Sequence, residues 1–188
     1  RVLFRSVGYD KDQSDIGSFV GTLNGRIENS VSYATVYGVR NVGGLAGKKG
    51  QSMGDCEIVN SAFLGTIEAT GGNVGGILAS GYISDSAPNT PPVTVRNCYV
   101  AADIIGNSTP LYFSNGYGAG GGIGGIAGSE IGLRGALNDA HISDNYFYGT
   151  ITDTNPDAGT KYARVGGILG EIGCYDPLKL TYENNYYL

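Results

Sequence analysis

One ten-residue phrase recurs along almost the whole sequence, and it restricts the fold more than any other feature. The phrase has the form I/V-x-N-(small or polar)-x-x-x-(G/A)-x-(I/V). It reads IENSVSYATV at 27–36, IVNSAFLGTI at 58–67, VRNCYVAADI at 95–104 and ISDNYFYGTI at 142–151, and half of it returns as YENNYYL at 182–188. Because a unit of this size cannot bury its own apolar face, its copies have to stack on one another.

A second, glycine-rich phrase alternates with the Asn phrase. Its copies begin at 16 (IGSFVG), 42 (VGGLAG), 74 (VGGILA), 123 (IGGIAG) and 165 (VGGILG), and each precedes one Asn phrase. These units predict one repeat region over 16–188. An entry segment over 1–15 precedes it, for which a partly non-native origin is one interpretation. A period of about 20 to 50 residues is typical of solenoids and propellers.

The phrases are rich in Val, Ile, Thr, Tyr and Phe and hold no helical period, so they are predicted to be strands. The first and last apolar positions of the Asn phrase lie nine residues apart. An odd spacing brings both to the inside only if the strand bends once between them. Asn suits such a bend because it tolerates the left-handed region.

We therefore predict an all-β fold, a parallel β-helix of about five rungs with glycine-rich corners. A four-stranded-blade propeller is the alternative. In the β-helix, equivalent bend residues stack at one corner as a structural ladder. The members of this Asn ladder are Asn29, Asn60, Asn97, Asp144 and Asn184.

The alternation of VGGLAG with an I-x-N-S phrase and a G-T-I ending resembles the GLUG repeat, which is found in large bacterial surface and secreted proteins. The resemblance covers 16–188, although this chain has long inserts and its first unit lacks the second Gly. It implies an adhesin-like protein or a non-catalytic region of a secreted immunoglobulin A peptidase, without catalytic residues. The expected location is the bacterial cell surface or the extracellular space. The chain is then expected to be a fragment of a longer protein, with neighbouring repeats at both ends.

Charge and hydropathy narrow the classes of partner. The formal net charge is −5 and no basic stripe is available to neutralise phosphates, so nucleic acid is not an expected partner. No run of 18 apolar residues exists, so no membrane span is expected. The cysteines are odd in number and lie at unrelated repeat positions, which predicts buried thiols rather than a disulfide framework. They are Cys56, Cys98 and Cys174.

Few residues suggest catalysis or metal binding. His141 is the only histidine and lies next to an inward apolar residue, so neither a Ser-His-Asp site nor a zinc site is expected. Asp10, Asp12 and Asp15 are spaced like the start of a calcium loop. The loop lacks its Gly and its closing Glu, which leaves only a weak metal candidate, and we predict no cofactor.

A fragment of a carbohydrate-active β-helix enzyme, either a glycoside hydrolase or a polysaccharide lyase, is the alternative function. Glu130 and Glu171 follow equivalent Gly phrases in consecutive units, which places them within about one or two rung spacings, near a glycosidase-like separation. Nothing in the sequence forces them into one groove. We therefore predict no catalytic residues in this chain.

Aromatic residues are the strongest indication of a binding surface. Two or four places after the bend, the later Asn phrases carry Tyr99, Tyr146 and Tyr148. If the bend itself resets the alternation, these tyrosines face solvent and can stack on sugar rings or contact another protein. If the shift falls later in the phrase, Tyr99 and its equivalents belong to the core. The insert 106–122 adds Tyr112 and Tyr117 as candidate ligand contacts.

The leading function is therefore a structural or adhesive module that binds carbohydrate or a host surface protein without catalysis. Because the fifth Asn phrase stops at Leu188, before its G-x-I ending, we also expect an open rung edge that is available for pairing.

Overall fold

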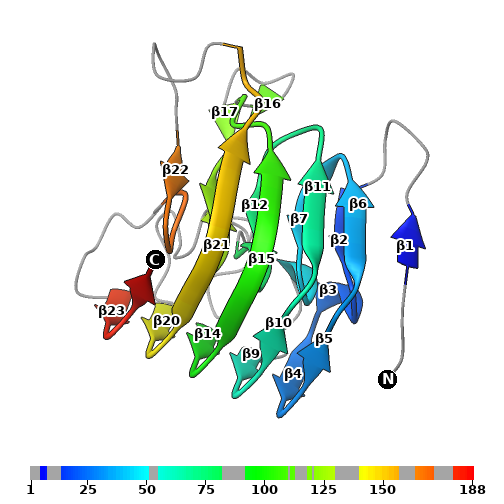
Figure 1. The fold of residues 1–188 in the computed structure, drawn as a ribbon. Helices are drawn as coiled ribbons and strands as arrows, with labels where there is room; N and C mark the ends of the chain where they lie inside the picture. The colour runs from blue at the N-terminus through cyan, green and yellow to red at the C-terminus, as the bar shows by residue number, and fades with distance from the viewer. Residues whose placement is uncertain are drawn as a thin grey trace.

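The computed structural model describes residues 5–7, 14–50, 55–81, 92–109, 111–112, 118–119, 121–129, 140–156, 164–171 and 180–188. In this part of the chain the regular elements are β-strands and no helix occurs (Figure 1). The protein is all-β, as the sequence predicts. None of the described elements is a helix of the length and apolarity that crossing a membrane requires.

The Gly phrases form two parallel sheets. The first sheet consists of β2 (Ser14–Gly17), β7 (Arg40–Gly43), β12 (Val74–Gly75), β18 (Ile123–Gly124) and β22 (Val165–Gly166). The second sheet consists of β3 (Val20–Leu23), β8 (Ala46–Lys49), β13 (Leu78–Ser80) and β19 (Ala127–Ser129). Leu169 extends the second sheet through a parallel bridge to Ala127.

The Asn phrases and the residues around them form two more sheets. The third sheet consists of β4 (Gly25–Glu28), β9 (Cys56–Val59), β14 (Val93–Arg96), β20 (Ala140–Ser143) and β23 (Leu180–Glu183). The fourth sheet consists of β1 (Arg5–Val7), β5 (Val31–Ser32), β6 (Thr35–Gly38), β10 (Ala62–Phe63), β11 (Thr66–Ala69), β15 (Tyr99–Gly106), β21 (Tyr146–Asp153) and β24 (Tyr186–Tyr187). A separate antiparallel hairpin contains β16 (Leu111–Tyr112) and β17 (Gly118–Ala119).

Each strand of the four large sheets pairs in parallel with the equivalent strand of a neighbouring unit. The residues that open the units share one register: Ile16, Val42, Val74, Ile123 and Val165. The chain visits the four sheets in the same order in each unit, so strands of successive units lie side by side, from blue to red in Figure 1.

The alternation of side chains is reset at the bend residue of each Asn phrase. In the first unit, Ile27 is buried before the bend, and Ser32 and Val36 are buried after it. The bend residues all have positive φ, between 50° and 57°: Asn29, Asn60, Asn97, Asp144 and Asn184. Apolar residues on both sides of the bend therefore face the same core.

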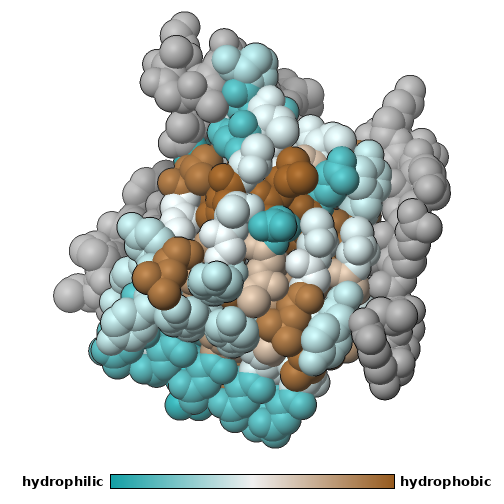
Figure 2. Space-filling view, in the orientation of Figure 1, coloured by the Kyte–Doolittle hydropathy of each residue, from teal (hydrophilic) through white to brown (hydrophobic). Residues whose placement is uncertain are grey.

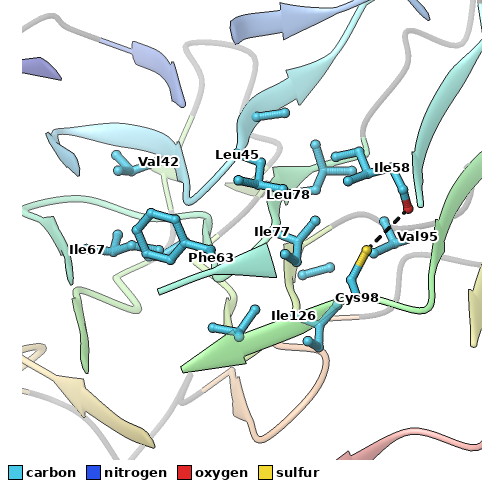
Figure 3. Packing of buried hydrophobic residues seen from close by; sticks show 14 of the residues in the cluster. Val42, Leu45, Ile58, Phe63, Ile67, Ile77, Leu78, Val95, Cys98 and Ile126 are labelled. Atoms are coloured by element: carbon cyan, nitrogen blue, oxygen red, sulfur yellow. Dashed lines mark hydrogen bonds between the residues drawn. The ribbon is translucent and has the colours of Figure 1, made fainter. Parts of the chain in front are cut away.

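The space enclosed by the sheets is filled with apolar side chains. Phe63 and Ile67 come from the fourth sheet, Ile58 and Val95 from the third, and Val42 from the first (Figure 3). All five are fully buried. Each unit thus contributes to one continuous core, which no single unit can form alone.

From the second unit on, the second glycine of the Gly phrase allows adjacent units to pack closely around the core. A Cβ at Gly76 would lie 2.0 Å from the carbonyl oxygen of Gly125 in the next unit and 2.8 Å from the side chain of Val100. Gly44 and Gly125 are crowded in the same way by the next unit's backbone and by a core side chain. Glycine is required here because the backbone of one unit touches the backbone of the next.

Gly76→Ala is expected to lower the free energy of unfolding by about 1–3 kcal/mol, because the added methyl group overlaps backbone that cannot move freely. Urea denaturation measures the change. Ala101→Ser is a matched control, since Ala101 lies in the same unit on the outer face of β15. An equal loss of stability in both variants would contradict the explanation.

Candidate functional site

The outer face of the fourth sheet carries the predicted tyrosines. Tyr99 and Tyr146 are in register on β15 and β21, and Tyr148 lies two residues further along β21. Tyr99 is 40% exposed and Tyr148 is 57% exposed, whereas Val100 and Phe147, which alternate with them, are buried. Of the two arrangements that the sequence leaves open, the structure has the one in which the bend resets the alternation.

The rings of Tyr99 and Tyr146 stack on one another. Their centroids are 5.7 Å apart and their planes are inclined by 20°. Each ring therefore covers one face of the other, and the pair presents its edges and its two outer faces. Tyr148 belongs to the neighbouring column, where Tyr33 is also about half exposed.

Polar side chains continue this surface beyond the tyrosines. Thr66, Asp103 and Thr150 are in register along the sheet, and the Thr150 hydroxyl donates to Asp103 Oδ1 at 2.6 Å. Figure 2 shows the face with apolar patches among residues of intermediate hydropathy. We call the exposed aromatic part of this surface, formed by Tyr33, Tyr99, Tyr146, Tyr148 and Tyr186, the tyrosine face.

The two insert tyrosines are not members of the tyrosine face. Tyr112 belongs to β16, and Tyr117 lies outside the described residues. The tyrosine face therefore consists only of residues in the strands of the fourth sheet or directly between them.

The predicted Asn ladder follows the corner between the third and fourth sheets, where hydrophilic residues line the lower edge of Figure 2. Asn97 Nδ2 donates to Asn60 Oδ1 at 3.2 Å, and Asn184 Nδ2 donates to Asp144 Oδ1 at 3.0 Å. In both bonds the amide donates to the preceding unit. The left-handed backbone of each residue aims its side chain along the stack, so one residue type serves as bend and as link.

A second ladder, which the sequence reasoning missed, lies directly before the Gly phrases. Asn73 Nδ2 donates to Asn41 Oδ1 at 2.8 Å, and Asn41 Nδ2 donates to Asp15 Oδ1 at 2.6 Å. All three residues have positive φ. The signal was present in the sequence, since each residue immediately precedes a Gly phrase.

The carboxylate of Asp15 is thereby engaged within the fold. Its Oδ1 accepts from Asn41, and its Oδ2 lies 2.6 Å from Lys48 Nζ. Asp10 and Asp12, the other members of the weak calcium candidate, lie outside the described residues. The part of the chain that the structure describes contains no cluster of three metal-ligating side chains.

A third polar column points inward from the residue after each bend. Asn145 is fully buried; its Nδ2 donates to Val95 O at 2.9 Å and to Asn185 Oδ1 at 3.0 Å, and its Oδ1 accepts from Cys98 N at 2.9 Å. Ser61 occupies the same place two units earlier, and its hydroxyl donates to Val59 O. This column ties the backbones of successive units together from inside.

Of the candidate catalytic residues, the structure describes His141 and Glu171. His141 lies on β20 between Thr94 and Thr181 of the neighbouring strands. Glu171 forms an ion pair with Arg164, with Oε1 2.9 Å from Nη1. Glu130 lies outside the described residues.

The thiols of Cys56 and Cys98 are free and buried, as predicted, while Cys174 lies outside the described residues. Burial raises the pKa of Cys56 to about 12 and the pKa of Cys98 to about 11. Desolvation also lowers the pKa of the buried Lys49, near Cys56. Both thiols are therefore protonated at neutral pH and are poor nucleophiles.

Comparison with protein-family models, with curated proteins and with solved structures found no match to this chain.

Asn97→Ala is expected to cost more stability than Asn97→Gly. Both variants lose the amide bond to Asn60, which contributes about 0.5–1.5 kcal/mol. Only Ala pays the additional ~1–2 kcal/mol of the left-handed backbone at φ 53°. Urea denaturation of both variants, with the outward Thr94→Ala of the same unit as control, measures the difference. An Ala variant as stable as the Gly variant would show that backbone strain is not the reason for Asn.

In a Cys174→Ser background, Cys56 and Cys98 are expected to react with a disulfide reagent only after denaturation, because both thiols are buried. Their folded pKa values lie above the ordinary value of 9.0. The free energy of unfolding is therefore expected to be fully retained below about pH 9 and to fall as pH rises toward the folded values. Thiol titration and urea denaturation at pH 8 and pH 10 check both points. Rapid labelling of the native protein would contradict them.

Proposed function

We propose that the chain folds as a parallel β-helix and serves as a non-catalytic structural or adhesive module. The in-register parallel pairing of equivalent strands in all four large sheets supports the β-helix, because it repeats the same path in every unit. A propeller instead builds each blade from antiparallel strands within one unit.

The tyrosine face is the observation that supports recognition. Tyr148 and Tyr33 are about half exposed on a regular, flat sheet surface, and Asp103 and Thr150 lie beside them in the next column. Aromatic surface combined with hydroxyl and carboxylate groups suits carbohydrate, whose rings have apolar faces and polar edges. A host surface protein is the alternative partner for the tyrosine face.

The cellular setting is proposed from the repeat. The resemblance to GLUG repeats and the acidic composition favour a segment of a large bacterial cell-surface or secreted protein. The structure adds no support to the enzyme alternative, since Glu171 is held by Arg164 and Glu130 lies outside the described residues.

A glycan array with the purified chain tests the proposal. Reproducible binding is expected, and Tyr148→Ala and Tyr99→Ala are each expected to weaken it about 2- to 10-fold, since an aromatic contact contributes ~0.5–1.5 kcal/mol beyond its buried area. Tyr148 is the cleaner position, because its exposed side chain adds little to the core.

His141→Ala is the matched control, because His141 lies on the third sheet rather than on the tyrosine face. Glycan binding that is lost equally in this control, or that survives both tyrosine variants, would contradict recognition by the tyrosine face. A chain that binds neither glycans nor host-cell proteins would leave only the structural role.

A further inference from the structure

One outward position near the middle of the fourth sheet carries a side chain that is smaller than its neighbours. Ala101 lies on β15, which runs between β11 and β21 in Figure 1. The strand register places Ala101 opposite Tyr148 on one side and opposite Leu64 on the other. Its methyl group extends less far from the sheet than either of these side chains. Because β15 has partner strands on both sides, this feature lies inside the stack and is independent of its two ends.

Two residues of β15 border the remaining sides of Ala101. Tyr99 precedes it by two residues and Asp103 follows it by two, so the three side chains share the outer face. Tyr99 is restrained by its stacking on Tyr146, and Asp103 accepts a hydrogen bond from the Thr150 hydroxyl at 2.6 Å. We call the place above Ala101 the Ala101 subsite; its bordering residues are Leu64, Tyr99, Asp103 and Tyr148.

Asp103 keeps an unused acceptor at the border of the Ala101 subsite. Its side chain is exposed, and Thr150 occupies only Oδ1. Within the described part of the chain, Oδ2 has no hydrogen-bond or ion-pair partner. An ionised acceptor forms hydrogen bonds that are roughly twice as strong as those of a neutral one. Asp103 can therefore accept a hydrogen bond from a ligand hydroxyl while it stays bound to Thr150.

The spacing of these groups suits a single sugar ring. The Cα atoms of Ala101 and Tyr148 are about 4.8 Å apart across the strands, and those of Ala101 and Asp103 are about 6.6 Å apart along β15. An aromatic side chain and a carboxylate thus meet at one small area of the sheet. A pyranose ring offers the matching pair of surfaces, a face of C–H groups and an edge of hydroxyls.

The charges of the fourth sheet disfavour acidic sugars. Glu68 is exposed on β11, one strand away from Asp103 and two residues further along, at about 8 Å between Cα atoms. The strands β5, β6, β10, β11, β15, β21 and β24 contain no Lys or Arg. Arg5 on β1 is three strand positions from β15. A carboxylate or sulfate group above Ala101 would therefore meet two like charges, within about one Debye length at physiological ionic strength.

We propose that the Ala101 subsite binds one uncharged pyranose residue of a glycan and discriminates against uronic, sialylated and sulfated sugars. The C–H face of the ring packs against Tyr148, and a hydroxyl of the ring donates to Asp103 Oδ2. This proposal rests on the proposed carbohydrate recognition by the tyrosine face, and it adds the class of sugar and its place. A sugar is favoured over a protein surface because the subsite is one residue wide, whereas a stable protein interface involves about 20–30 residues a side.

A glycan array that carries the same oligosaccharides in neutral and acidic form tests the charge preference. Suitable pairs are lactose-terminated glycans with and without a sialic acid cap, and galactan oligosaccharides with and without sulfate. The neutral member of a pair is expected to bind about 3- to 10-fold more tightly, because the acidic member meets Asp103 and Glu68. The preference is expected to shrink at 0.5 M salt, since salt screens exposed charges. Equal binding of both members would overturn the proposal.

Asp103→Asn tests the carboxylate. This variant keeps an acceptor but loses the charge, so it is expected to weaken binding of the neutral glycans by about 3- to 10-fold. It is also expected to bring the ratio of neutral to acidic binding closer to one. Glu57→Gln removes the same charge from the third sheet and is expected to change neither quantity. Equal effects of the two variants would show a general effect of net charge and would overturn the role of Asp103.

Two substitutions of Ala101 test the place of the sugar without removing a bordering residue. Ala101→Leu fills the subsite and is expected to weaken binding of the neutral glycans by about 5- to 100-fold, because overfilling displaces the ring. Ala101→Ser stays small and is expected to bind like the parent chain. Urea denaturation of both variants checks that the outward substitutions leave the fold intact.

The outcomes separate this proposal from the one on which it rests. Glycan binding that is lost in Tyr148→Ala but survives Ala101→Leu would overturn the Ala101 subsite and leave recognition by the tyrosine face standing. A parent chain that binds no glycan, whether or not it binds host-cell proteins, would overturn both the subsite and the carbohydrate recognition.

Discussion

The in-register pairing of each unit on the next is the constraint on which the rest of the structure depends. It places like residues in columns, so that one choice of side chain is repeated through the whole stack. A left-handed Asn at the bend is favourable because the same residue lies above and below it to share its amide. Any unit taken alone would have neither a core nor partners for these polar groups.

Close approach between successive units is the second requirement, and it explains the high glycine content. The glycine pairs bring the backbone of one unit against the next and leave room for Phe63 or Val100 beneath it. The first unit has Ser18 at the second-glycine position, and its hydroxyl is the one buried side-chain polar atom without a partner among the described residues. Departure from the pattern at the end of the stack thus leaves a polar group unsatisfied, which a unit with glycine avoids.

The sequence was sufficient to predict those features that depend on the residues of a single repeated phrase. Strand alternation and the bend at Asn97 and its equivalents depend on local chemistry, so the repeated spacing was sufficient to find them. The ladder of Asn41 and Asn73 was missed because the residues that precede the five Gly phrases differ in type: Asp, Asn, Asn, Gly and Arg. Only the strand register shows that the first three are linked by hydrogen bonds. The sequence did not decide whether Tyr99 is exposed. The nine-residue spacing is satisfied whether the inward–outward alternation is reset at the bend or at the later Gly or Ala. The contacts of Asn145 needed the neighbouring units, which a linear pattern does not supply.

The Asn ladder also bears on how the protein ages. Asparagine slowly loses its side-chain amide to become aspartate, and the fold already holds one aspartate in the ladder, Asp144, which accepts from Asn184. Where aspartate is the product, the change removes a donor but keeps an acceptor, and the left-handed backbone of Asp144 shows that aspartate fits the bend. Conversion of Asn97 or Asn184 is different, since it would set two carboxylates face to face beside Asp144. Loss of the amide at either of these two positions would thus set like charges against each other at the corner of the stack.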